Sequence, residues 1–98
     1  MRKAFLLAYS NSLGTRDQVK QYLNSMPEVY HWRYDLPNAF YLISNSTSKD
    51  LGIALHRLAG NQGRFIIVEI QSSYGWLPKQ TWYLIKNKEH PPKLPDAG

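Results

Sequence analysis

The chain has 98 residues, enough for one domain with a single hydrophobic core and too few for two. Its hydrophobic content of 43% and charged content of 19% are ordinary for a globular protein and exclude a disordered or fibrous chain. The absence of cysteine excludes disulfides and thiolate zinc sites. The net charge of +5 is compatible with an anionic partner, but the basic residues are scattered and do not identify one.

The first half of the chain predicts a strand, a helix and a β-hairpin. Residues 4–9 form a short apolar run that is typical of a buried strand. Thr15 and Gln18 have the spacing of a capping box, which predicts that a helix begins there. Apolar and polar residues then alternate over residues 28–35, and after a turn with Pro and Asn the chain returns through residues 39–44. These two segments are expected to pair as an antiparallel hairpin.

The second half predicts a helix, a strand and a short last helix. Leucine and alanine recur at helical spacing from Leu51 to Leu58, and Gly60 follows where a helix end favours a left-handed residue. Residues 64–72 are almost continuously apolar, as expected for a strand covered on both faces. Pro78 suits the first turn of a helix that runs to about residue 86, since its missing N–H is not needed there.

This order, β-α-β-β-α-β followed by a short helix, is the ferredoxin-like order. We therefore expect an α+β fold in which two helices cover one face of a four-stranded antiparallel sheet. Residues 1–88 should form the single domain and residues 89–98 a flexible, proline-rich tail. The other face of the sheet is then left for a nucleic acid, a protein or a second copy. No apolar stretch approaches the roughly 20 residues of a membrane span, so we expect a cytoplasmic protein without a membrane partner.

Few residues have a spacing that is typical of catalysis. The three histidines, His31, His56 and His90, lack the spacing of metal ligands. Glu69 is the acid that stands out, because it interrupts an apolar strand, but an ion pair with Arg33 or Arg64 across the sheet is favoured over catalysis. The chain has no glycine-rich phosphate loop, no Ser-His-Asp pattern and no usefully spaced pair of carboxylates, so no metal and no cofactor are expected.

Aromatic residues alternate with basic ones in the first hairpin strand. Tyr30, Trp32 and Tyr34 would share one face, and His31 and Arg33 the other. Aromatic rings beside a basic residue are found on surfaces that bind single-stranded nucleic acid. Aromatic rings also fill the core beneath helices. The sequence leaves both interpretations open.

Several segments together resemble a known group of small proteins. The segments are the strand end "LLAYSN", the hairpin "HWRYDLPNAFYLISNSTS", the strand "RFIIVEIQ" and the following "GWLP". They resemble the ferredoxin-fold proteins grouped with the CRISPR-associated endoribonuclease-like proteins, whose relatives include the virulence-associated protein D toxins and SinR-like proteins. The resemblance covers roughly residues 4–86 and rests on element order and scattered matches.

The resemblance implies a homodimer, and in the active members a catalytic Asp at the end of the first strand. Two such Asp residues, one from each subunit, are thought to hold a divalent metal near the dimer axis. Here the matching residue is Ser10, which follows Tyr9. A neutral hydroxyl does not supply the anionic oxygen that a hard cation prefers. The chain is therefore expected to lack the nuclease chemistry while keeping the fold and the dimer.

The resulting prediction is a small dimeric binding protein that is associated with nucleic acid or has a regulatory role. Two alternatives remain open: a metal-dependent endoribonuclease or toxin component that uses Glu69 or Asp17, and a protein-binding module with no nucleic-acid role. RNA, DNA and protein are all possible partners. The candidate binding residues are Ser10, Asn11, Ser12, His31, Arg33 and Arg64.

Overall fold

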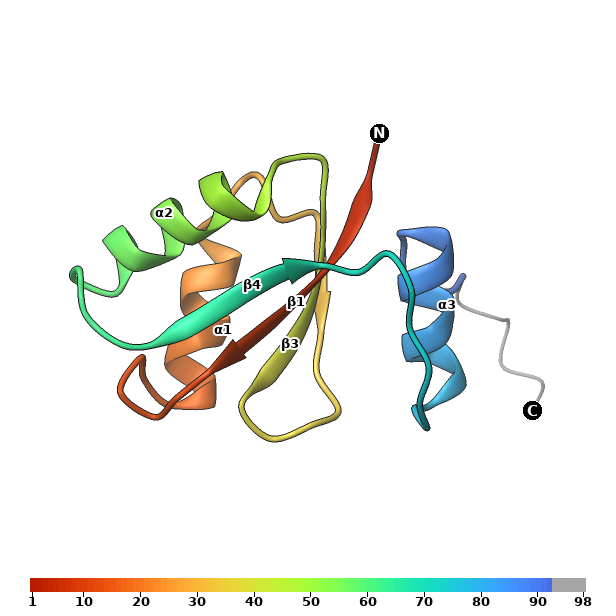
Figure 1. Ribbon diagram of the computed structural model, residues 1–98, viewed down its shortest axis with the longest axis horizontal. Helices are drawn as coiled ribbons and strands as arrows, with labels where there is room; N and C mark the ends of the chain where they lie inside the picture. Colours follow the sequence, from red (N-terminus) through yellow and green to blue (C-terminus); the bar gives the residue numbers. More distant parts are fainter. Residues whose placement is uncertain (93–98) are drawn as a thin grey trace.

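The computed structural model describes residues 1–92 and has the predicted order of elements. The elements are β1 Lys3–Tyr9, α1 Arg16–Asn24, β2 His31–Arg33, β3 Ala39–Ser44, α2 Ser48–Leu58, β4 Phe65–Glu69 and α3 Lys79–Asn87 (Figure 1). The fold is α+β and ferredoxin-like, as the sequence predicts. A flexible tail was expected over residues 89–98, and residues 93–98 of it lie outside the described residues.

All four strands belong to one antiparallel sheet with the order β2-β3-β1-β4. The central strand β1 pairs on one side with β3, where Phe5 lies opposite Leu42, and on the other side with β4, where Phe5 lies opposite Glu69. Because side chains alternate along a strand, this register assigns each residue of the sheet to one of two faces. The face toward α1 and α2 is called the helix face below, and the opposite one the second face.

The main core lies between the helix face and the two helices α1 and α2. Thr15 caps α1 in the predicted capping box: its hydroxyl accepts from the Gln18 backbone N–H, and the Gln18 side chain accepts from the Thr15 N–H. The apolar stripe that follows is buried against the sheet. The fully or almost fully buried side chains of this core include Phe5, Leu7, Val19, Leu23, Phe40, Leu42, Leu51 and Leu55.

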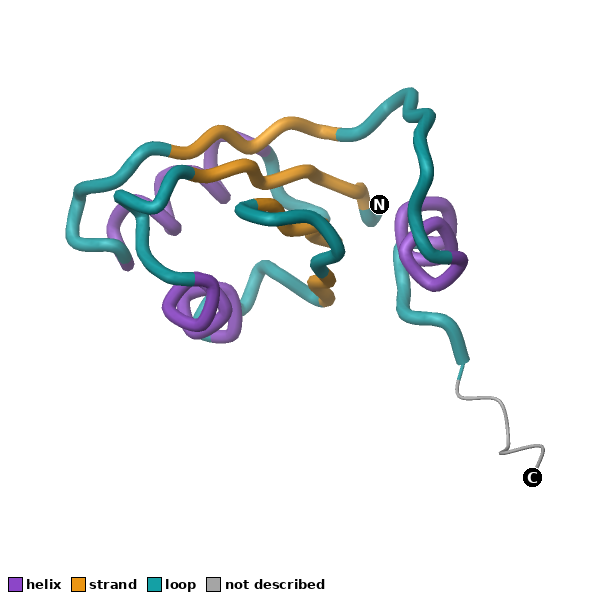
Figure 2. Tube along the Cα trace, turned by 90° about the horizontal axis from the view of Figure 1, so that it is seen from below, coloured by secondary structure: helices purple, strands orange, loops and turns teal. Residues whose placement is uncertain are grey.

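The third helix, α3, packs against the second face of the sheet. Leu84 and Ile85 of α3 form a separate buried cluster with Ala4, Tyr41 and Ile43. In Figures 1 and 2, α3 accordingly stands apart from α1 and α2. The second face is therefore covered over the first half of β1 and the second half of β3, and only the remainder is free for a partner.

A buried polar group fastens α3 to the edge strand β2. Thr81 of α3 is fully buried, accepts a hydrogen bond from Arg33 Nε at 2.6 Å and donates to the Asp35 carboxylate. Arg33 and Asp35 also form an ion pair, with 3.4 Å between Nε and Oδ2. Burial and the nearby Asp35 carboxylate raise the pKa of the Tyr41 hydroxyl above its ordinary value. Arg33, Thr81 and Asp35 therefore each have a polar partner, which is the condition for burying such groups.

The strand β4 differs from the prediction that it would be covered on both faces. It is an edge strand, and α3 does not reach its second face, where Ile66 is 60% and Val68 40% exposed. Only Ile67, on the helix face, is buried. The expectation was wrong because a continuous apolar run shows only that a strand is compatible with burial. It does not show that other elements of the fold pack on both of its faces.

The strand β2 is shorter than the predicted residues 28–35. Regular pairing with β3 covers only His31–Arg33. A turn bonds the Val29 N–H to the Met26 carbonyl at 3.1 Å, and the Val29 side chain packs against the main core. The alternation of side chains in the sequence therefore begins in the turn before β2 and is not confined to the residues that pair with β3.

Candidate functional site

Ser10, Asn11, Ser12 and Arg64, four of the six candidate residues, lie together. The Ser10 N–H donates to the Arg64 carbonyl at 2.9 Å, and the Arg64 N–H donates to Ser12 Oγ at 3.1 Å. The hydroxyls of Ser10 and Ser12 bond to each other. The Asn11 side chain accepts from Asn38 Nδ2 at 3.0 Å. The loop after β1 is therefore joined to the chain segments before β4 and before β3.

A glycine makes the close approach of these segments possible. Gly63 has a φ of +94°, and a Cβ added to it would lie 2.6 Å from the Leu13 Cα. Real Cβ atoms do not come so close to backbone, so any side chain here would separate the two loops. Gly63 thus positions the backbone of Arg64 against Ser10 and Ser12.

The shallow depression at this end of the sheet is lined by hydroxyl-bearing, apolar and basic side chains. Its lining residues are Ala8, Tyr9, Ser10, Arg64, Phe65 and Ile66, with no carboxylate among them. Within residues 1–92, no three His, Asp or Glu side chains lie close enough together to hold a metal ion. The serine hydroxyls are held by hydrogen bonds to one another and to the backbone.

His31 and Arg33 lie away from this loop, on β2 at the far edge of the sheet from β4. The His31 ring contacts His90 edge to face, with 4.8 Å between the ring centroids. Burial, together with the nearby His90 and Arg2, lowers the pKa of His31 below its ordinary value, while Glu89 opposes the shift. Arg33 is engaged by Thr81 beneath α3. The six candidate residues therefore form two separate groups rather than one site.

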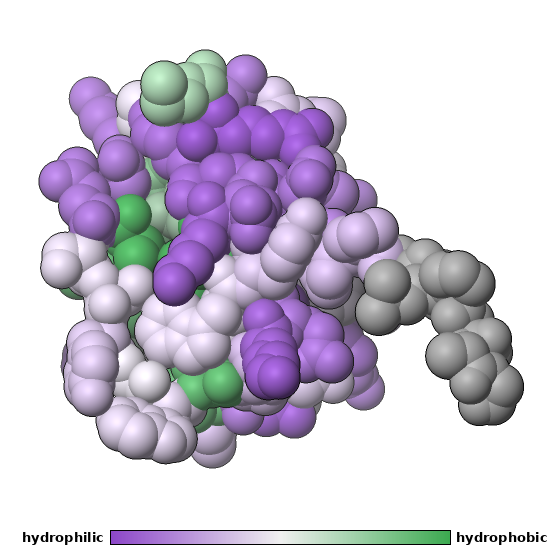
Figure 3. Space-filling view, turned by 90° about the vertical axis from the view of Figure 1, so that its right-hand side faces the viewer, coloured by the Kyte–Doolittle hydropathy of each residue, from purple (hydrophilic) through white to green (hydrophobic). Residues whose placement is uncertain are grey.

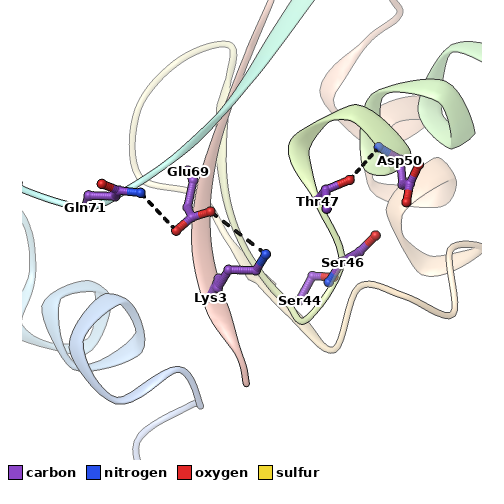
Figure 4. A network of polar contacts seen from close by, with 7 residues as sticks. All are labelled: Lys3, Ser44, Ser46, Thr47, Asp50, Glu69 and Gln71. Atoms are coloured by element: carbon purple, nitrogen blue, oxygen red, sulfur yellow. Dashed lines mark hydrogen bonds and ion pairs between the residues drawn. The ribbon is translucent and has the colours of Figure 1, made fainter.

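Glu69 lies at the opposite end of β4 from Arg64. Its carboxylate is 3.9 Å from Lys3 Nζ and accepts a hydrogen bond from Gln71 Nε2 at 3.3 Å (Figure 4). An ion pair was expected, but with Arg33 or Arg64 as the partner. The partner is Lys3 because the register places Glu69 opposite Phe5, near the start of β1. Figure 4 also shows Ser44 and Ser46, which are in contact at the end of β3, and Thr47, which accepts from the Asp50 N–H at the start of α2.

The aromatic rings of the β2 region lie on the helix face. Trp32 and Tyr34 pack against the main core, and Trp32 Nε1 donates to Asn24 Oδ1 of α1 at 2.8 Å. The guanidinium of Arg16, also on α1, lies 4.5 Å from the centre of the Tyr34 ring. Of the two interpretations left open by the sequence, core packing thus accounts for Trp32 and Tyr34.

A second aromatic group lies beside α3 and was not singled out from the sequence. Tyr74 and Trp76, in the loop between β4 and α3, are 89% and 85% exposed. The adjoining groove is lined by Ser73, Tyr74, Gly75, Lys79, Trp82 and Lys86. The segment "SYGWLP" contained the necessary indication, because Tyr and Trp flank a glycine there without the alternation of a strand. A further recess continues along the second face past Leu6, Val68 and Leu77.

Comparisons with known proteins identify no relative of this chain. No protein-family model, no curated protein and no solved structure matches it. The resemblance inferred from the sequence therefore gains no support from them. In the described part of the chain, no helix is long and apolar enough to cross a membrane.

Proposed function

We propose that the chain is a non-catalytic binding domain that forms a homodimer through the second face of β4 and associates with nucleic acid. The observation that carries the proposal is the exposure of Ile66 and Val68, two branched apolar side chains on the same face of an edge strand. Contiguous apolar surface of this kind marks interaction sites in globular proteins.

The exposed side chains of β4 form a patch with their neighbours on β1. Ile66 lies opposite Ala8, and Val68 lies opposite the partly buried Leu6. The other edge of β4 has no strand partner within residues 1–92. Neither Pro nor Lys interrupts β4, although these residues commonly protect edge strands from pairing. A second copy of the same surface would cover these groups, and a two-fold arrangement satisfies both copies at once.

The chemistry of the loop after β1 supports a role without catalysis. Ser10 and Ser12 offer uncharged oxygens that already hold hydrogen bonds within the loop. Uncharged hydroxyls do not offset the dehydration of Mg²⁺ or Mn²⁺. Glu69, the rival acid, has Lys3 and Gln71 as its partners at the other end of the strand.

The charge of the chain supports an anionic partner. Its net charge is +5, and a protein that contacts phosphates with Lys or Arg gains affinity by releasing counterions. A protein partner with no role for nucleic acid is the competing proposal. The salt dependence of RNA binding separates the two, because affinity based on phosphate contacts falls steeply as the salt concentration rises.

Light scattering and RNA binding test the proposal in one preparation. The wild type should have twice the 11.4 kDa mass of one chain, and Ile66→Lys should reduce it to a monomer. Ile53→Lys is the matched control, because Ile53 is another exposed isoleucine, 47% against 60% for Ile66, and lies on α2, away from the second face. A monomeric wild type would refute the dimer. The absence of RNA binding at low salt would refute the nucleic-acid role and favour a protein partner.

A further inference from the structure

Two aromatic side chains stand almost fully in water beside α3. Tyr74 and Trp76 contact each other edge to face, with 5.8 Å between the ring centroids, and bury little else. An edge-to-face pair leaves the two faces of one ring free for a third flat group. Gly75 between them has no atom within 4 Å of the position a Cβ would take. The pair therefore lies at the surface with open space around Gly75, where a planar ligand has access to it.

The groove beside these rings adds positive charge. Lys79 and Lys86, both on α3, line it together with Tyr74 and Trp82, and its volume is about 380 Å³. This volume lies within the roughly 300 to 1,000 Å³ of sites for ligands of small-molecule size. No carboxylate is among the lining residues. Figure 3 shows the side of the molecule that carries α3, where pale and strongly hydrophilic side chains dominate and hydrophobic ones occupy small areas.

We propose that this groove binds single-stranded nucleic acid. Bases stack on the exposed rings of Tyr74 and Trp76, and the phosphates between them contact the ammonium groups of Lys79 and Lys86. Stacking on aromatic rings combined with a cationic groove is the general means by which proteins hold single strands with little preference for sequence. The inference rests on the proposed association with nucleic acid and assigns it to these residues.

The composition of the surface favours nucleic acid over protein. Protein interfaces are enriched in Tyr, Trp and Arg but depleted in Lys, and here both cations are lysines. Trp82 at the base of the groove packs against the second cluster of the core, so one wall of the groove is fixed by the fold. A groove that is formed in advance loses less entropy when an extended strand binds.

Fluorescence anisotropy with a labelled oligouridine RNA of about 12 nucleotides tests the site, since this length fits the known range for single-strand sites. Trp76→Ala should weaken binding by at least about 5-fold, the low end of what one stacked base contributes. Trp76→Phe keeps a ring and should bind more tightly than Trp76→Ala. Because Trp76 is exposed, all three proteins should unfold at the same temperature, which separates a binding defect from misfolding.

The lysines are tested by the dependence of affinity on salt between about 50 mM and 200 mM. The double variant Lys79→Gln with Lys86→Gln should reduce the slope of log affinity against log salt by about 1.4, since each phosphate contact on a single strand contributes about 0.7. Lys49→Gln is the control, because Lys49 is exposed on α2, on the opposite side of the sheet. Its slope should equal that of the wild type.

The outcomes separate this site from the proposed function. If the wild type binds RNA and the Trp76 and lysine variants bind equally well, the site is refuted while the nucleic-acid role stands. If the wild type binds no RNA at low salt, both are refuted. If Trp76→Ala alters the mass in light scattering and leaves RNA affinity unchanged, the surface is a contact between copies of the chain, which also refutes the site.

Discussion

Arg33 on the edge strand β2 donates from Nε to the hydroxyl of Thr81 on α3, across 2.6 Å. Thr81 has no exposed surface, and its own proton goes to the Asp35 carboxylate. One threonine hydroxyl thus connects a cation and an anion of the sheet to a helix that lies 46 or more residues further along the chain. The attachment of α3 therefore depends on a polar contact as well as on its apolar side.

Thr81→Val should destabilise the protein by about 1.5 to 3 kcal/mol, the usual contribution of hydrogen bonds to charged groups. Valine has nearly the same shape as threonine but neither donates nor accepts, so Arg33 and Asp35 lose their shared contact. Urea denaturation gives the free energy of unfolding. Asp17→Asn, at an exposed position of α1, is the control and should change it little. Equal stability of Thr81→Val and the wild type would show that the hydroxyl does not hold α3.

Gly63→Ala should be strongly destabilising, because the new Cβ would lie 2.6 Å from the Leu13 Cα at a φ of +94°. Strain of this kind costs about 1 to 3 kcal/mol before any clash is counted. Gly75→Ala is the matched control, since no atom lies within 4 Å of its added Cβ. Thermal unfolding of both variants checks the prediction. A Gly63→Ala protein as stable as Gly75→Ala would mean that the loops separate without cost.

Acidification should reduce stability through His31, whose pKa lies below its ordinary value of 6.5. Between its pKa in the folded protein and 6.5, the unfolded chain binds more protons than the folded one, so the free energy of unfolding falls as pH decreases. Burial, His90 and Arg2 lower the pKa of His31, and Glu89 raises it. Denaturation between about pH 7.5 and 5.5 should show this loss in the wild type and a smaller one in His31→Gln. His56→Gln, at an exposed position of α2, should behave as the wild type does.

Ser10→Asp should create metal affinity that the wild type lacks. If the dimer keeps the geometry that the resemblance implies, two such carboxylates would approach each other near the dimer axis, and carboxylate oxygen is the ligand that Mg²⁺ and Mn²⁺ prefer. Calorimetric titration with Mn²⁺ should detect binding to Ser10→Asp and none to Ser10→Ala. The wild type should not cleave RNA or DNA with either metal. Metal-dependent cleavage by the wild type that disappears in Glu69→Ala would instead establish Glu69 as a catalytic acid.

The helices and strands can mostly be predicted from the sequence, because the interactions that begin and end them involve residues close together in the chain. The capping box at Thr15 and Gln18 and the left-handed Gly60 after α2 each involve a few consecutive residues, and both are confirmed. The order of the elements then leaves few possible topologies for a chain of this size, and the ferredoxin-like order is among them.

The remaining features depend on contacts between distant residues. The partner of Glu69 is Lys3, which follows from the register of β4 on β1 and from no local pattern. Whether Ile66 and Val68 are covered depends on where α3 docks, and the apolar run of β4 is the same in either case. For the candidate site, proximity along the chain correctly predicted the cluster of Ser10 with Ser12. Proximity along the chain did not predict that Arg33 donates a hydrogen bond to Thr81.

Because α3 packs on the second face by itself, the protein has parts that differ in local stability. The strand β3 is buried along its whole length and lies between β2 and β1, so its amides should exchange with solvent only when the whole domain opens. The helix α3 is held by a small cluster and one polar group, and its opening leaves the main core intact. Partial unfolding should therefore begin at α3. Each such opening would expose the apolar side chains of Ala4, Tyr41 and Ile43 near β4, and transiently exposed apolar surface promotes aggregation.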